Sequence, residues 1–198
     1  MLDYYDPLLI LKHLEAIRTL FLPLLNKKAV DAADQYLVQL KRRKKLKNPT
    51  FIGVHVRRTD YLSWIKTQFK GTPVDENYFK YAFEQFRKKY EEPIFVVLSD
   101  DRKWCMTHLK DMGSDVVFPV LKTDLVEPAV QDFVLLVQTN HTIFDYGSFG
   151  FLSSLLAGGD TMYATGYSVK KHPILQALHK AAPWNWEHVD VSQGHIFY

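Results

Sequence analysis

Two arginines and an aspartate follow directly on a short, largely apolar segment of the sequence. Residues 51–56 alternate between apolar and other side chains, and Arg57, Arg58 and Asp60 come next. A guanidinium group stays charged and matches the oxygens of a phosphate through paired hydrogen bonds, and a nearby carboxylate can orient it. The pattern fits an anion-binding site at the end of a strand, and it equally fits an ion pair that only closes the strand.

Two further clusters also follow apolar segments. Asp100 comes after residues 94–98, where an acidic side chain can bind a ribose hydroxyl or a base edge or can take part in capping the next helix. Gly147, Ser148 and Phe149 come shortly after residues 142–144, and a glycine and a serine at a helix start present backbone N–H groups to an anion. This third cluster is neither GxGxxG nor GxxxxGK[ST], so the signatures of dinucleotide binding and of a P-loop are missing.

The elements expected around these clusters alternate between strands and helices. The apolar pattern predicts strands at residues 51–57, 94–98, 115–118, 142–144 and 161–164, and helices at residues 76–90, 101–112, 128–137 and 149–157. This alternation is typical of an α/β fold with a Rossmann-like, doubly wound parallel sheet. Ligands of such sheets bind beyond the carboxyl ends of the strands, and all three clusters fall there.

Helices are also expected before the first strand, over residues 6–47, with a break at Pro23. The chain therefore divides, on sequence grounds, into a helical lead-in of residues 1–48 and an α/β domain of residues 49–198. The lead-in ends in an unbroken basic run, Lys41 to Lys45. Such a run is typical of a solvated helix end, and the alternative is a patch that binds a polyanion or directs nuclear targeting.

Composition excludes several classes of protein. Hydrophobic residues make up 47% of the 198 and charged residues 24%, which is typical of a folded domain. The formal net charge of +3 is too mild to predict nucleic-acid binding. Cys105 is the single cysteine, so no internal disulfide can form, and we expect its thiol to be buried. The eight histidines form no close ligand cluster, so no metal site is predicted.

The sequence predicts neither a membrane span nor a secretion signal. No stretch of about 18 apolar residues occurs, and the first residues lack a basic segment followed by an apolar run.

Taken together, the three clusters resemble the motifs of the galactoside α1,2-fucosyltransferases, which form glycosyltransferase family 11. The first motif is Val-His-Val-Arg-Arg-Thr-Asp-Tyr-Leu at residues 54–62. The second is Pro-Ile-Phe-Val-Val-Leu-Ser-Asp-Asp at residues 93–101. The third and most specific comprises residues 132–133, 139–143, 147–151 and 156–161. The resemblance covers about residues 50–165 and corresponds to the C-terminal, donor-binding half of that family.

The resemblance implies a GT-B-like enzyme whose Rossmann-like half, residues 49–198, binds GDP-β-L-fucose. It further implies an inverting transfer of fucose to a terminal galactoside of a glycan, without a metal or other cofactor. The family resemblance places such enzymes on the lumenal side of the Golgi membrane, held by an anchor that is absent from this sequence.

The resemblance also implies roles for individual residues. One of Arg57 and Arg58 contacts the β-phosphate, and the other holds the loop through a pair with Asp60. The remaining expected donor contacts are His55, which frames the guanosine through its backbone, Asp100 for guanine or ribose, and Ser148 with the amides of Gly147 to Phe149 for phosphate.

Other functions stay open at this point. Thr59 stands where the α1,2 group often has glycine, so a fucosyltransferase of different linkage is one alternative. A non-catalytic relic that binds a GDP-sugar or a glycan is a second. A polyanion-binding protein that uses Lys41 to Lys45 is a third.

Overall fold

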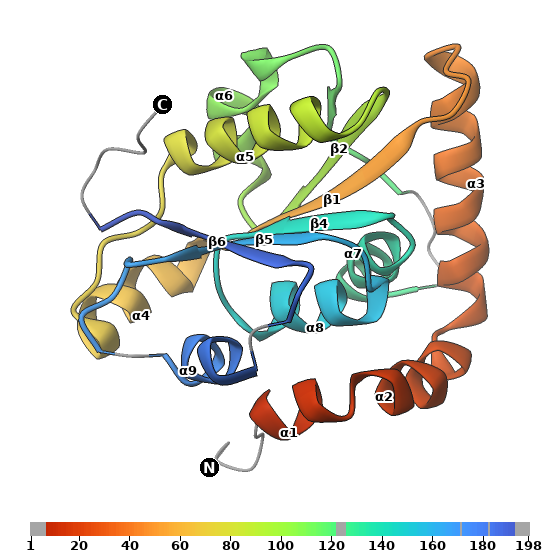
Figure 1. The fold of residues 1–198 in the computed structure, drawn as a ribbon. Coiled ribbons are helices and arrows are strands. Elements are labelled where there is room, and N and C mark those ends of the chain that lie inside the picture. Colours follow the sequence, from red (N-terminus) through yellow and green to blue (C-terminus); the bar gives the residue numbers. More distant parts are fainter. Residues whose placement is uncertain (1–6, 122–125, 171, 182, 193–198) are drawn as a thin grey trace.

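The computed structural model describes residues 7–121, 126–170, 172–181 and 183–192. Six parallel strands form one sheet in the order β3-β2-β1-β4-β5-β6 (Figure 1). The strands are β1 (Thr50–Val56), β2 (Pro93–Ser99), β3 (Val116–Val117), β4 (His141–Phe144), β5 (Thr161–Thr165) and β6 (Trp186–Asp190). This is the doubly wound Rossmann order, and it reverses direction at β1. The predicted fold class is confirmed.

Helices cover both faces of the sheet. They are α1 (Pro7–Lys12), α2 (Leu14–Phe21), α3 (Lys27–Arg43), α4 (Thr59–Phe69), α5 (Glu76–Lys89), α6 (Arg102–His108), α7 (Pro128–Val137), α8 (Ser148–Ala157) and α9 (Pro173–Ala181), with short 3₁₀ turns at Leu22–Leu24 and Lys110–Met112. One core lies between the sheet and α5 with α6. The cores on the other face hold α3 with α7, and α8 with α9.

Strand β1 shows how the alternation of its side chains builds these layers. Ile52, Val54 and Val56 are fully buried in the core under α5. Gly53 and His55 point to the opposite face, where a Cβ on Gly53 would lie 2.6 Å from the Thr139 hydroxyl. The strand is therefore covered on both faces, as expected in the middle of a parallel sheet.

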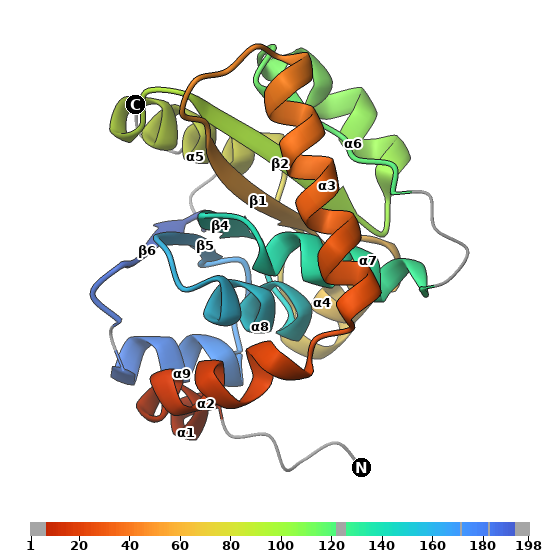
Figure 2. The same cartoon turned by 90° about the vertical axis from the view of Figure 1, so that its right-hand side faces the viewer.

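The helices before β1 pack on the same sheet. Ala29, Ala33, Leu37 and Leu40 form the buried side of α3 and belong to one core with residues of β2 and α7. Farther back, α1 packs against α9 (Figure 2). The division of the chain at residue 48 stays a prediction about its organisation.

Three elements were not anticipated from the sequence, namely α4, α9 and β6. Helix α4 begins without a side-chain cap at Arg58, so the usual start signal is missing. Strand β6 is an edge strand with only two buried residues, Trp186 and Val189, so its apolar pattern is weak. Cys105 is 1% exposed, as expected. Within the described ranges, no helix is long and apolar enough to cross a bilayer.

Candidate functional site

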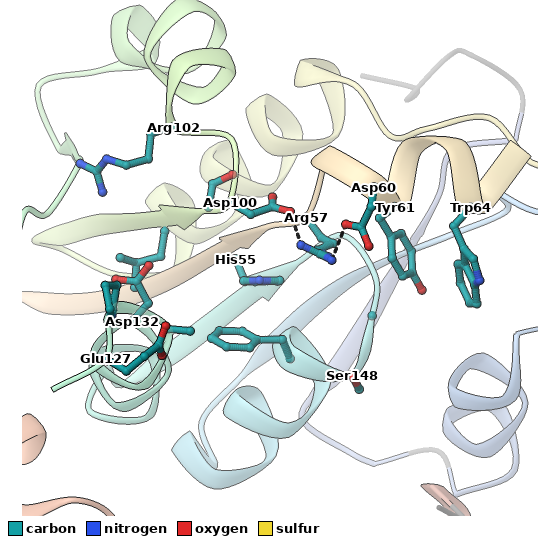
Figure 3. Close-up of a pocket in the computed structure, with 16 residues that line it drawn as sticks. His55, Arg57, Asp60, Tyr61, Trp64, Asp100, Arg102, Glu127, Asp132 and Ser148 are labelled. Atoms are coloured by element: carbon teal, nitrogen blue, oxygen red, sulfur yellow. Dashed lines mark hydrogen bonds and ion pairs between the residues drawn. The ribbon is translucent and has the colours of Figure 1, made fainter. Parts of the chain in front are cut away.

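A cavity of about 740 Å³ lies at the carboxyl ends of β1 and β2, beside the start of α8 (Figure 3). We call it the central pocket. Its lining includes His55 and Arg57 after or within β1, Ser99 and Asp100 at the end of β2, Asp60, Tyr61 and Trp64 of α4, Glu127 and Asp132 at α7, and Gly147, Ser148 and Phe149 at the start of α8. Seven of the eight site residues predicted from the sequence therefore line one cavity. The exception is Arg58.

Arg57 is held between two carboxylates. Its Nη2 donates to Asp60 at 2.6 Å, and its Nη1 donates to Asp100 (Figure 3). Its backbone N–H donates to Asp145 at 2.9 Å. About 29% of the Arg57 side chain is exposed, so the guanidinium faces the pocket in a fixed orientation. Because it is positioned before any ligand arrives, it need not reorganise to meet an anion.

Arg58 points away from the pocket. Its guanidinium carbon lies 3.9 Å from the centre of the Trp104 ring, and its Nε is 3.8 Å from a carboxylate oxygen of Asp101. Arg58 is thus the arginine that packs beneath the loop, whereas Arg57 faces the cavity. Asp60 pairs with Arg57, so the arginine that faces the cavity is also the one paired with Asp60. Which of the two arginines contacts a phosphate stays a prediction.

The two acids after β2 divide their tasks. Asp101 accepts from the backbone N–H of Trp104 at 3.0 Å and caps α6. Asp100 accepts from the Arg58 backbone N–H at 2.8 Å, and also from the Arg57 guanidinium and the Thr59 hydroxyl. The Asp100 carboxylate therefore ties the end of β2 to the turn that follows β1.

Asp145, directly after β4, is a site residue that the sequence reasoning missed. It is 2% exposed and accepts from the backbone N–H groups of Arg57 and Tyr146 at 2.9 and 2.7 Å. Burial raises the pKa of this carboxyl well above its ordinary value, although both backbone hydrogen bonds oppose the shift. Asp145 fixes the backbone at Arg57 from the neighbouring strand. An acid at the end of an apolar strand was the signal that could have revealed it.

The start of α8 offers backbone donors to the pocket. Gly147 precedes the helix with φ of +88°, and its Cβ would meet Tyr61 only at 3.9 Å, so backbone conformation and not space requires glycine there. No side chain caps this helix start. Its first N–H groups, beginning at the exposed Ser148, can therefore bind an anion.

A stacked pair forms the floor beside this helix start. The rings of His55 and Phe149 lie 4.8 Å apart at an angle of 25°. Burial lowers the pKa of His55 to about 4, so the ring is neutral at neutral pH. Its Nδ1 has no hydrogen-bond partner among the described residues. The side chain of His55, and not only its backbone, therefore shapes the pocket.

Two acidic side chains lie at one end of the central pocket, Glu127 at the N-cap of α7 and Asp132 in the middle of that helix. Burial raises the pKa of Asp132 to about 6, and nearby Arg102 opposes that shift. The Asp132 carboxylate makes no ion pair with the described residues. Glu127 accepts from the backbone N–H of Val130 at 3.2 Å and caps α7. Sequence reasoning placed Asp132 in a motif but assigned it no role.

Aromatic side chains line the opposite end of the pocket (Figure 3). Tyr61 stacks on Tyr146 with ring centres 4.9 Å apart, and Trp64 lies 4.7 Å from Tyr61. The Tyr61 hydroxyl lies 3.4 Å from Nε2 of His172. Aromatic faces beside an exposed carboxylate, that of Asp60, suit the apolar faces and hydroxyls of a sugar.

Among the residues that the structure describes, no group of three or more histidine, cysteine, aspartate or glutamate side chains is arranged to hold a metal ion. The lysine and arginine side chains among the described lining residues are Arg57 and Arg102.

Comparison with known proteins identifies similar sequences. A sequence profile described as glycosyl transferase family 11 matches residues 25–190. The chain is 43% identical over 128 residues to galactoside alpha-(1,2)-fucosyltransferase 2 of Pongo pygmaeus, covering 64% of this chain and 36% of that protein. It is 39% identical over 143 residues to galactoside alpha-(1,2)-fucosyltransferase 1 of Oryctolagus cuniculus, covering 72% of this chain and 38% of that protein. The matched region thus spans well under half the length of these relatives.

Proposed function

The chain belongs to glycosyl transferase family 11, and from that premise we propose that it forms the donor-binding part of a galactoside α1,2-fucosyltransferase. The donor is GDP-β-L-fucose, and the acceptor is a glycan that ends in galactose. One observation carries the proposal: Arg57 is fixed between two carboxylates in a cavity that also receives the uncapped start of α8. The names of the relatives support the choice of sugar and linkage.

The acidic end of the central pocket is our proposed binding site for the guanine of GDP-fucose. Guanine presents two neighbouring N–H donors on one edge, and an ionised carboxylate accepts both. Asp132 lines the pocket without an ion-pair partner among the described residues, so it is our candidate for this contact. Asp100, the candidate from the sequence, is already bonded to Arg57, Arg58 and Thr59 and acts as a positioning residue.

The middle of the pocket is the proposed binding site for the diphosphate. In the transfer, the bond between the fucose anomeric carbon and the β-phosphate oxygen breaks, and a galactoside oxygen bonds to that carbon from the opposite face. The proton of the attacking hydroxyl leaves to a base, and negative charge develops on the β-phosphate. The Arg57 guanidinium and the first amides of α8 stabilise that charge, with Asp60 orienting Arg57. These cationic and dipolar groups support a metal-independent transfer.

The aromatic end of the pocket is the proposed binding site for the fucose and the acceptor galactoside. With the base at Asp132 and the diphosphate at Arg57, the fucose would extend toward Tyr61 and Trp64. The acceptor galactoside would then enter beside Asp60, whose side chain is 75% exposed.

A transfer assay tests this proposal. The purified chain would be incubated with GDP-fucose and a galactose-terminated disaccharide in the presence of EDTA, and the product linkage would be determined by NMR. Fucose on the galactose 2-hydroxyl is the expected result. A product of another linkage would overturn the assignment to the α1,2 group, and restoration of activity only by a divalent cation would overturn metal independence.

The second candidate is a chain that binds GDP-fucose without transferring it. The observation that favours it is that Arg57, the start of α8 and Asp132 all serve the donor in the arrangement above, and no described residue is assigned as the base for the acceptor's proton. GDP binding together with no product in the transfer assay would select this candidate.

We also propose a location on the lumenal side of the Golgi membrane, on the basis of the family resemblance. Co-localisation of the endogenous protein with a Golgi marker in fixed cells is the expected result, and a diffuse or nuclear signal would contradict it.

A further inference from the structure

A second concave surface lies at the β3 edge of the sheet, and we call it the basic groove. Its volume is about 530 Å³. The lining residues are Tyr36, Leu40, Arg43 and Lys44 of α3 and its end, Arg102, Met106 and Lys110 of α6 and the following turn, and Val116, Val117, Phe118 and Val120 of β3 and the segment after it. Residues of α3 and of α6 line the groove together, and Figure 2 shows α6 near the C-terminal half of α3.

The charged side chains among the described residues that line the groove are all positive. Four cationic side chains line it, and no aspartate or glutamate is among the described residues that do so. None of the four forms an ion pair within the described part of the chain. Arg43 lies over the Tyr36 ring at 5.9 Å, and Lys44 donates to the Ser114 carbonyl at 2.5 Å. A concave surface of one charge sign attracts an anionic ligand.

Apolar groups on the same surface narrow the class of anion. Met106 is 42% exposed and Val120 is 65% exposed, while Phe118 is partly buried. Sulfated polysaccharides and nucleic-acid backbones carry no aliphatic side chain that would cover these groups. A peptide can supply carboxylates for the cations and an apolar side chain for Met106 and Val120.

The position of β3 favours an extended chain. Strand β3 pairs with β2 on one side and ends the sheet of the described residues on the other. An edge strand can hydrogen-bond the backbone of an added peptide. Helix α6 packs on one face of the sheet and α3 on the other, and cations at both helices line the groove. Acidic side chains on either face of an added strand would therefore meet positive charge.

We propose that the basic groove binds an acidic peptide segment of a partner protein, anchored by one apolar side chain among its carboxylates. The site is separate from the proposed transfer reaction. Arg102 lines both the groove and the acidic end of the central pocket, so the test variants leave Arg102 in place. The proposal gives a use to the basic run at the end of α3 that the transfer reaction does not need.

The test measures fluorescence anisotropy of a labelled nonapeptide with four glutamates on each side of a central leucine. The chain should bind it saturably. The double variant Arg43→Glu/Lys110→Glu should bind about tenfold more weakly or worse, because two attractive charge pairs become repulsive. A peptide with serine in place of leucine should bind the unaltered chain about threefold to tenfold more weakly, because burial of the apolar anchor is lost.

Matched controls separate the groove from general charge. The variant Lys28→Glu/Lys180→Glu makes the same change of net charge at exposed positions on α3 and α9, and it should bind the leucine peptide like the unaltered chain. Circular dichroism and GDP binding would show that each variant is folded. Three results would each overturn the proposal. The first is equal weakening in both double variants, and the second is equal binding of the leucine and serine peptides. The third is tighter binding of heparin or of phosphatidylserine vesicles than of the peptide.

Discussion

In the central pocket Arg57 is bonded to two carboxylates, whereas Arg43 and Lys110 in the basic groove form no ion pair with the described residues. Ion pairs fix Arg57 in one orientation, which suits a reaction that develops charge at one oxygen. Cations that form no ion pair within the described ranges, on a half-apolar surface, suit a ligand that needs attraction more than fixed geometry. The two regions show that the surroundings of a cation, and not its presence, indicate its use.

The largest expected effect comes from Arg57→Lys. The charge is kept, but an ammonium group cannot bond both carboxylates in the planar arrangement of a guanidinium. We expect kcat/KM for fucose transfer to fall about 100-fold. Steady-state kinetics would show this, and circular dichroism would confirm folding. A loss below about threefold would mean that charge alone is needed, as in the basic groove.

Removal of a carboxylate that positions Arg57 should also lower the rate of the proposed fucose transfer. Asp100→Ala deletes the acceptor for Arg57, Thr59 and the Arg58 backbone. We expect kcat/KM to fall about tenfold to 30-fold, because the guanidinium and its turn lose their fixed orientation.

Asp111→Ala, an exposed acid near the basic groove, is the matched control and should leave transfer unchanged. Tighter GDP binding in Asp100→Ala would contradict the positioning role, because it would show that Asp100 competes with the phosphate for Arg57.

Acidification should weaken GDP binding at the acidic end of the central pocket. Because burial raises the pKa of Asp132 to about 6, its carboxylate becomes protonated below that pH and loses acceptor capacity. We expect affinity for GDP to fall about tenfold between pH 7.5 and 5. The effect of Asp132 on folding stability has the opposite sign. Because its carboxyl pKa is raised in the folded state, the free energy of unfolding rises as the pH falls through 6. Protonation of Asp132 would therefore not unfold the protein, and unfolding from this cause would not explain a loss of GDP affinity.

The Asp132→Asn variant supplies the control for this pH effect. The terminal phosphate of GDP also titrates near pH 6, by analogy with other phosphate monoesters at about 6. In Asp132→Asn the phosphate still titrates but residue 132 does not. Isothermal titration calorimetry should therefore show a smaller pH dependence of the GDP affinity. His55 does not titrate in this range, because burial lowers its pKa to about 4. An unchanged pH profile in Asp132→Asn would contradict the guanine assignment.

The smallest expected effect is that of salt on GDP binding. A rise in ionic strength from about 0.05 to 0.3 M should weaken GDP binding no more than about threefold, because partly buried charges are screened weakly. The acidic nonapeptide should lose more affinity over the same range, because Arg43, Arg102 and Lys110 of the groove are exposed. Anisotropy and calorimetry in matched buffers would compare them. Equal salt dependence would remove the distinction between the two regions.

The fold and the strand ends that carry the site were predictable from the sequence. Apolar segments predicted the strands β1 to β5 but not β6, and parallel topology brings their carboxyl ends to one edge of the sheet. The clusters at Arg57, Asp100 and Gly147 therefore had to lie close together, and the structure places all three at one cavity.

Other features of the site depend on packing that the sequence pattern does not report. Arg57 and Arg58 are adjacent and chemically alike, and the contacts that separate them, Arg58 with Trp104 and Arg57 with Asp60 and Asp100, come from other elements or exist only in the folded turn. Asp132 reaches the pocket from the middle of a helix, where no turn or cap signal marks it. Asp145 acts through a backbone N–H on the neighbouring strand, a contact that exists only once β1 and β4 pair.

The most direct measurement is a calorimetric titration of the chain with GDP in the presence of EDTA, beside Arg57→Ala and Arg58→Lys. The central claim is that Arg57, and not Arg58, holds the diphosphate in the central pocket. It predicts saturable binding to the unaltered chain, similar binding to Arg58→Lys, and an affinity about 100-fold lower or undetectable in Arg57→Ala. Unchanged affinity in Arg57→Ala, or no binding of GDP to the folded unaltered chain, would contradict the account.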